Sequence, residues 1–234
     1  MNKIPLLLLP GTLNNARVWA AQVAALAPVA DIRVADISTQ DSMTAMADDA
    51  IRAMPARFAI AGFSLGGFVA LEIMRRAGAR VAGLGLFSTS ARAEPEAAKP
   101  GREKSIALAQ RDFAQLLAGM RPFVLGPHSL GDGALNAHLD TMMHEVGAAA
   151  FVRQSRAVIN RAESRDLLPA ITCPTLIVCG RADAVCPPKL SEEMAAAIPG
   201  ADLHLLDDAG HMLPFEAPAA LNALMQQWLG RITV

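Results

Sequence analysis

The chain has 234 residues, of which 53% are hydrophobic and 18% are charged, and its formal net charge is −1. This length and apolar content are enough for one domain with a large core, residues 1–234, and no second domain is required. Lysine and arginine are scattered along the chain, so neither nucleic acid nor an anionic membrane surface is expected as a partner.

Short apolar runs of strand length alternate with stretches of helical apolar spacing over most of the chain. The predicted strands are Ile4–Leu9, Ile32–Ile37, Arg57–Ala61, Val81–Phe87, Pro174–Cys179 and Leu203–Leu206. The predicted helices between and after them are Val18–Leu26, Met43–Met54, Phe68–Arg76, Lys189–Ala197 and Pro218–Leu229. This alternation predicts an α/β fold with one doubly wound, mainly parallel sheet, whose ligands bind at the carboxyl ends of the strands.

The alternation stops between Ser90 and about Leu168, where helical periodicity continues without a convincing strand. We expect residues 91–168 to form a helical cap inserted over the carboxyl edge of the sheet. Its helices are predicted near Glu103–Ala118, Asp132–Val146 and Ala148–Asn160. The apolar side chains that either line a substrate mouth or form the cap's own core are Phe123, Leu130, Leu139, Met142 and Met143.

The stretch Ala61-Gly62-Phe63-Ser64-Leu65-Gly66-Gly67 lies between a predicted strand and a predicted helix. A G-x-S-x-G sequence can arise by chance, but in this context it is typical of a nucleophile elbow. Such a turn holds its serine in a strained backbone conformation, and the chain passes so close that only glycine fits beside it. Ser64 is therefore the candidate nucleophile.

A serine hydroxyl needs a base, and the base needs a group that orients it. His211 follows the last predicted strand, so it is expected at the carboxyl edge where Ser64 also lies. Of the other histidines, His204 lies within that strand, and His128, His138 and His144 lie in the cap. Asp183 follows the strand Pro174–Cys179 by one short turn and is the candidate acid, although an ordinary solvated turn aspartate is the alternative. Asp207 and Asp208 are the next carboxylates to consider.

The order Ser64, Asp183, His211 resembles that of the α/β-hydrolase superfamily. The resemblance covers nearly the whole chain and is closest to a compact esterase and enol-lactonase-like branch. The motifs that carry it are Leu8-Leu9-Pro10-Gly11, Gly62-Phe63-Ser64-Leu65-Gly66-Gly67, Cys173-Pro174-Thr175-Leu176, Gly180-Arg181-Ala182-Asp183 and Gly210-His211. The chain has Pro10 where that family usually has histidine.

The resemblance implies acyl transfer by a triad of Ser64, Asp183 and His211, without a cofactor. It places the oxyanion hole at the backbone N–H groups of Leu65 and Thr12, with the Thr12 hydroxyl or the Leu13 amide as alternatives. We expect a small-molecule ester or lactone substrate. A thioesterase, carbon–carbon hydrolase or acyltransferase would use the same residues, and a non-catalytic binding protein on this fold is the alternative from another class.

The composition of the cap predicts a small, largely apolar substrate. The expected pocket residues are Leu13, Phe123, Met142, Met143 and Met212. A flexible methionine pair suits an adaptable apolar pocket. Three cap arginines, Arg121, Arg153 and Arg156, are expected on the solvated helix surface. The alternative is that one of them reaches inward to bind a substrate carboxylate.

The start of the chain and the cysteines bear on location and metal binding. Ile4 to Leu9 are too few residues for a signal sequence or a membrane span before Pro10-Gly11. Cys173, Cys179 and Cys186 are odd in number and have no CxxC spacing, which favours free thiols in a reducing compartment over disulfides or zinc. We therefore expect a cytoplasmic protein without a metal site.

Overall fold

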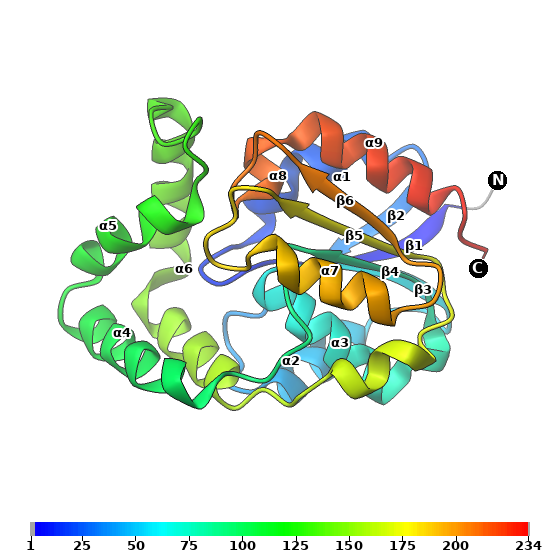
Figure 1. Cartoon of the computed structure of the whole chain (residues 1–234), viewed down its shortest axis with the longest axis horizontal. Helices are drawn as coiled ribbons and strands as arrows, with labels where there is room; N and C mark the ends of the chain where they lie inside the picture. The colour runs from blue at the N-terminus through cyan, green and yellow to red at the C-terminus, as the bar shows by residue number, and fades with distance from the viewer. Residues whose placement is uncertain (1–2, 234) are drawn as a thin grey trace.

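A six-stranded parallel sheet forms the centre of the computed structural model, which describes residues 3–233 (Figure 1). The order of the strands in the sheet is β2-β1-β3-β4-β5-β6, and each neighbouring pair is parallel. The strands are β1 Ile4–Leu9, β2 Ala30–Val34, β3 Phe58–Phe63, β4 Val81–Phe87, β5 Thr175–Gly180 and β6 Asp202–Leu206. The predicted α/β fold with a parallel sheet is confirmed.

Both faces of the sheet are covered, because successive side chains of each strand point to opposite sides. In β3, Ala59 and Ala61 pack with Leu221 and Trp228 on one face. Phe58 and Ile60 pack into the core of the other face. This two-sided burial explains why the central strands are apolar throughout.

The helices cover the sheet in two layers (Figure 1). One layer holds α1 Ala20–Leu26, α8 Leu213–Glu216 and α9 Pro218–Leu229. The other holds α2 Met43–Ile51, α3 Leu65–Ala77 and α7 Pro188–Ala197. Short 3-10 helices lie at Ala16–Trp19, Gly78–Arg80, Glu96–Ala98 and Arg165–Ala170.

Three predicted element boundaries were wrong for local reasons. The second strand is Ala30–Val34 instead of Ile32–Ile37, and the side chain of Asp36 accepts a hydrogen bond from the Ser38 amide in the turn that follows. The second helix ends at Ile51, three residues before Met54. The single helix expected near Glu103–Ala118 is two helices, because Asp112 has a non-helical backbone and its side chain caps the Gln115 amide at 2.9 Å.

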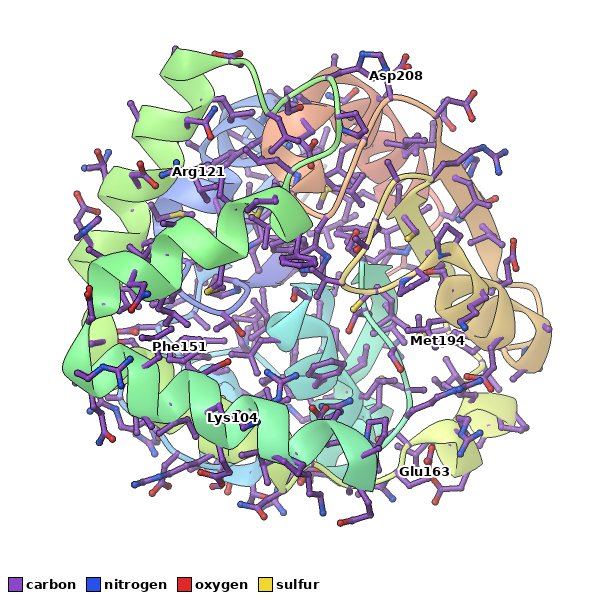
Figure 2. The ribbon with its side chains drawn as sticks, turned by 60° about the vertical axis from the view of Figure 1, so that its left-hand side comes forward. Lys104, Arg121, Phe151, Glu163, Met194 and Asp208 are labelled. Carbon is purple, nitrogen blue, oxygen red and sulfur yellow. The ribbon has the colours of Figure 1, made fainter. Side chains whose placement is uncertain are left out.

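The segment between β4 and β5 carries three helices beyond the carboxyl ends of the strands (Figure 1). These helices, α4 Lys99–Arg111, α5 Phe113–Val124 and α6 Gly133–Ile159, are called the helical insert below. Figure 2 brings the insert to the front, with Lys104 on α4 and Arg121 on α5. Over residues 3–233, no helix is both long and apolar enough to cross a membrane.

The long helix α6 is interrupted at Gly147, where two separate helices were predicted to meet. Gly147 has φ 81° and ψ 166°, a combination that is essentially restricted to glycine. A side chain at this position would meet open space, so the backbone alone imposes the restriction. The break changes the direction of α6 before it reaches Phe151, which contributes to the cavity described below.

We predict that Gly147→Ala lowers the free energy of unfolding by about 1–3 kcal/mol, because alanine is strained in this backbone conformation. The measurement is urea unfolding followed by circular dichroism. Gly133→Ala is the matched control, since Gly133 also faces open space but lacks a positive φ. Equal stabilities of the two variants would show that the break in α6 imposes no strain.

Candidate active site

Ser64 lies on a sharp turn between the end of β3 and the start of α3. Its backbone has φ 53° and ψ −116°, outside the regions that a non-glycine residue normally adopts. A Cβ at Gly62 would lie 2.2 Å from the Gly66 carbonyl oxygen, and one at Gly66 would lie 2.1 Å from the Leu9 carbonyl oxygen. The turn therefore requires glycine at both positions, as the motif predicted.

Hydrogen bonds from the neighbouring strand hold this turn in place. The Ser64 amide donates to the Phe87 carbonyl oxygen at 2.9 Å. The Thr89 hydroxyl donates to the Ser64 carbonyl oxygen at 2.8 Å. In the sequence, Thr89 stood out only as part of the polar end of a strand. Its contact with Ser64 depends on the pairing of β3 with β4.

His211 lies between Ser64 and Asp183. Its Nε2 is 2.9 Å from Ser64 Oγ, and its Nδ1 is 2.9 Å and 3.0 Å from the two Asp183 carboxylate oxygens. His211 is 4% exposed and Asp183 is 3% exposed, while Ser64 is half-buried. The structure thus brings the three predicted residues together in hydrogen-bonding geometry.

The loop after β5 fixes the orientation of the Asp183 carboxylate. Its Oδ1 accepts hydrogen bonds from the backbone amides of Val185 at 2.9 Å and Cys186 at 2.7 Å. The alternative carboxylates face elsewhere. Asp207 pairs with Arg181, and Asp208 is exposed 3.9 Å from His128.

The loop after β1 lies next to Ser64 and is held by a residue of the helical insert. The Leu13 amide donates to Gln154 Oε1 at 2.9 Å, and Gln154 Nε2 donates to the Ile37 carbonyl oxygen at 3.3 Å. The Leu13 amide is therefore already used, whereas Thr12 lines the cavity beside Ser64. The role of Gln154 could not be predicted from the residues around it in the sequence, because its hydrogen-bond partners are more than 100 residues away.

A cavity of about 520 Å³ is bounded by Ser64 and His211 and by the helical insert. The predicted pocket residues Phe123, Met143 and Met212 line it. The apolar side chains that the insert contributes are Leu108, Leu116, Met120, Phe123, Val124, Met143 and Phe151. The size and the mainly apolar lining suit a small organic molecule.

Two other expected pocket residues, Leu13 and Met142, do not line the cavity. Leu13 and Met142 are completely buried in the core next to the cavity, so their side chains do not form its wall. Leu139 is also a core residue, and Leu130 is exposed. Helical periodicity identified the apolar positions but not which side of each helix faces the sheet.

Polar and charged side chains also line the cavity. None of the three candidate arginines lines the cavity: Arg121 pairs with Asp140 at 2.6 Å, Arg153 donates to the Ser38 carbonyl oxygen at 2.9 Å, and Arg156 is exposed. Instead, Glu94 and Arg102 contribute to the wall. Asn14 also lines the cavity and is 3% exposed. Within residues 3–233, neither polar atom of its side-chain amide has a hydrogen-bond partner.

The three cysteines, Cys173, Cys179 and Cys186, are free thiols. Burial, together with the charge of Asp183, raises the pKa of the Cys179 thiol to about 12. The same two causes raise the pKa of Cys186, and burial raises that of Cys173. All three thiols remain protonated at neutral pH and are poor nucleophiles.

Comparison with known proteins identifies relatives of this chain and of its fold. The model described as the alpha/beta hydrolase family matches residues 6–224. A 2-hydroxy-6-oxononadienedioate/2-hydroxy-6-oxononatrienedioate hydrolase from Pseudomonas is 33% identical over 110 residues, which are 47% of this chain and 39% of that protein. A pimeloyl-[acyl-carrier protein] methyl ester esterase from Neisseria meningitidis is 31% identical over 172 residues, 69% of this chain and 54% of that protein. The chain therefore spans about half or less of the length of these curated relatives.

The solved structures include one with a similar fold over the whole chain. A thermophilic esterase from Thermogutta terrifontis, with malate bound, superposes with a TM-score of 0.92 and is 27% identical. The alignment covers 100% of this chain and 92% of the esterase.

We predict that Gln154→Leu lowers the free energy of unfolding by about 1–3 kcal/mol, because it leaves the buried Leu13 amide without an acceptor. Thermal and urea unfolding measure the change. Gln110→Leu on the exposed surface of α4 is the matched control and should have little effect. A Gln154 variant as stable as this control would show that the bond to the Leu13 amide contributes nothing.

Proposed function

The chain belongs to the alpha/beta hydrolase family, and on this premise we propose that it is a serine hydrolase. Its substrate is a carboxylic ester or lactone of a small, largely apolar molecule, and the reaction passes through an acyl-enzyme on Ser64. The observation that carries the proposal is the position of His211, within 2.9 Å of both Ser64 Oγ and the Asp183 carboxylate at the wall of the cavity.

In the acylation step, His211 Nε2 accepts the Ser64 proton while Ser64 Oγ attacks the substrate carbonyl carbon. The carbonyl oxygen becomes an oxyanion, which accepts hydrogen bonds from the backbone amides of Leu65 and Thr12. Leu65 is the first residue of α3, where the free N–H groups and the helix dipole favour negative charge. Asp183 keeps the His211 Nδ1 proton in place and stabilises the imidazolium.

The tetrahedral intermediate then expels the alcohol, which takes its proton from His211 Nε2. His211 next removes a proton from a water molecule, and the hydroxide attacks the acyl-enzyme. When the second intermediate collapses, the acid leaves and Ser64 Oγ recovers its proton from His211. The two half-reactions balance without a cofactor.

The cavity supports a small substrate. Its insert wall is largely apolar, with the flexible side chains of Met120 and Met143 among the lining residues. The name of the Neisseria meningitidis relative identifies that protein as a methyl ester esterase, in agreement with ester hydrolysis here. A thioesterase, a carbon–carbon hydrolase, an acyltransferase and a non-catalytic binding protein are the competing functions.

A fluorophosphonate should label Ser64 alone, because Ser64 is the serine with His211 in hydrogen-bonding position. Peptide mapping by mass spectrometry identifies the labelled residue. Ser64→Ala should abolish both labelling and hydrolysis of short aryl esters, while the protein remains folded by circular dichroism.

Labelling of another serine, or full ester turnover by Ser64→Ala, would contradict the assignment of the nucleophile. Acyl-CoA thioesters and carbon–carbon substrates tested in parallel with esters and enol lactones distinguish the competing enzymes. Absence of both labelling and turnover would favour a binding protein.

Asp183→Asn should lower kcat by about 10⁴, because the asparagine amide stabilises the wrong tautomer of His211. Steady-state kinetics on an aryl ester measures the effect. Asp207→Asn is the matched control, since Asp207 lies on the surface and pairs with Arg181 instead of His211. Near-normal turnover by Asp183→Asn would move the role of the acid to another carboxylate.

A further inference from the structure

An ionic cluster at the cavity wall has no role in the reaction described so far. Glu94 is 7% exposed and lies between two arginines. Its Oε1 accepts a hydrogen bond from Arg102 Nε at 2.8 Å, and its Oε2 accepts one from Arg161 Nη1. Burial by itself would raise the pKa of Glu94, but the hydrogen bonds and charges of Arg102 and Arg161 hold that pKa below its ordinary value. The cluster therefore contains one carboxylate and two guanidinium groups.

The two arginines differ in how far their hydrogen-bonding capacity is used. Arg161 also donates to the carbonyl oxygens of Arg92 at 2.8 Å and Val158 at 3.3 Å, and its guanidinium lies 4.3 Å from the centre of the Phe68 ring. These contacts hold the Arg161 side chain in place, so its role is structural.

Arg102 has one hydrogen bond, through Nε to Glu94, among residues 3–233. Its side chain is 33% exposed and lines the cavity. The hydrogen bonds among the described residues leave the terminal guanidinium nitrogens of Arg102 unused, and Glu94 holds the side chain in position through Nε. Because the cluster carries one positive charge in excess, an anionic group at this wall would be stabilised.

We propose that Arg102 binds a carboxylate carried by the substrate, so that the preferred ester or lactone has one free carboxylate in addition to the scissile carbonyl. A guanidinium presents its N–H donors in a planar fork that matches the two oxygens of a carboxylate, unlike the compact charge of a lysine ammonium group. The single excess positive charge of the cluster balances the charge of one carboxylate, whereas two excess positive charges would be needed to balance a phosphate monoester dianion. This assignment rests on the proposed serine hydrolase function and narrows its substrate class to half-esters of dicarboxylic acids, or lactones that carry a carboxylate, in which one charged group is attached to an otherwise apolar molecule.

The test compares pairs of methyl esters that differ only at the far end of the acyl chain. One member ends in a carboxylate and its partner in a primary amide, over a series of chain lengths. A second series carries the carboxylate or amide on the alcohol, which identifies the part of the substrate that reaches Arg102. The readout is the ratio of kcat/KM for the acid to that for the amide.

We expect the wild-type ratio to reach about 10–100 at one or two chain lengths, as for a hydrogen bond between charged groups. Arg102→Gln should bring the ratio close to one, and Arg102→Lys should retain part of it. Arg121→Gln is the matched control, because Arg121 lies on the same insert, pairs with Asp140 and does not line the cavity. This control should keep the wild-type ratio.

The possible failures are distinguishable. A wild-type ratio of one or less at every length, or a preference that survives Arg102→Gln, would overturn the carboxylate site while ester hydrolysis by Ser64 stands. A loss of both activities by the same factor in Arg102→Gln would assign Arg102 a structural role and also overturn it. Absence of turnover of either ester by the wild type, with no labelling of Ser64, would refute the serine hydrolase function itself.

Discussion

The close approach of backbone segments around Ser64 is the constraint on which the rest of the site depends. Gly62 and Gly66 let the turn after β3 pass against the start of α3 and the end of β1. Ser64 is held there with φ 53°, a conformation that costs about 1–3 kcal/mol and persists only if its surroundings impose it. The sheet does so through the hydrogen bonds of Phe87 and Thr89 to the backbone of Ser64. Ser64 is thus positioned by β4, the strand that pairs with β3.

The parallel strand order brings the other two residues of the site to the same edge. β5 and β6 follow β4 in the sheet, so the loops that carry Asp183 and His211 leave from neighbouring carboxyl ends. Glu216 links the His211 loop to the helical insert, because its two carboxylate oxygens accept the Met212 amide at 2.9 Å and the Gly126 amide at 2.7 Å. The cavity wall and His211 are therefore tied together, and we expect movement of the insert to affect both.

The fold and the three residues Ser64, Asp183 and His211 were predictable because local patterns specify them. Buried parallel strands are apolar throughout, and each of the three residues follows one of them within a few positions. The cavity wall was much less predictable. Helical spacing did not distinguish Met142, which is in the core, from Met143, which lines the cavity. Gln154 also escaped prediction, because its hydrogen-bond partners lie in distant loops. Arg102 escaped prediction although its partner Glu94 is close in sequence, because its place in the cavity wall depends on how α4 packs.

The central claim is that hydrolysis passes through an acyl-enzyme formed by Ser64. The most direct test uses esters that share one acyl group but differ in the alcohol, hydrolysed in the presence of a fixed concentration of methanol. All of these esters give the same acyl-enzyme, because the alcohol has already left when water or methanol attacks. The ratio of methyl ester to free acid among the products should therefore be the same for every substrate. A ratio that changes with the leaving alcohol would contradict the account, because water and methanol would then be attacking the substrates directly.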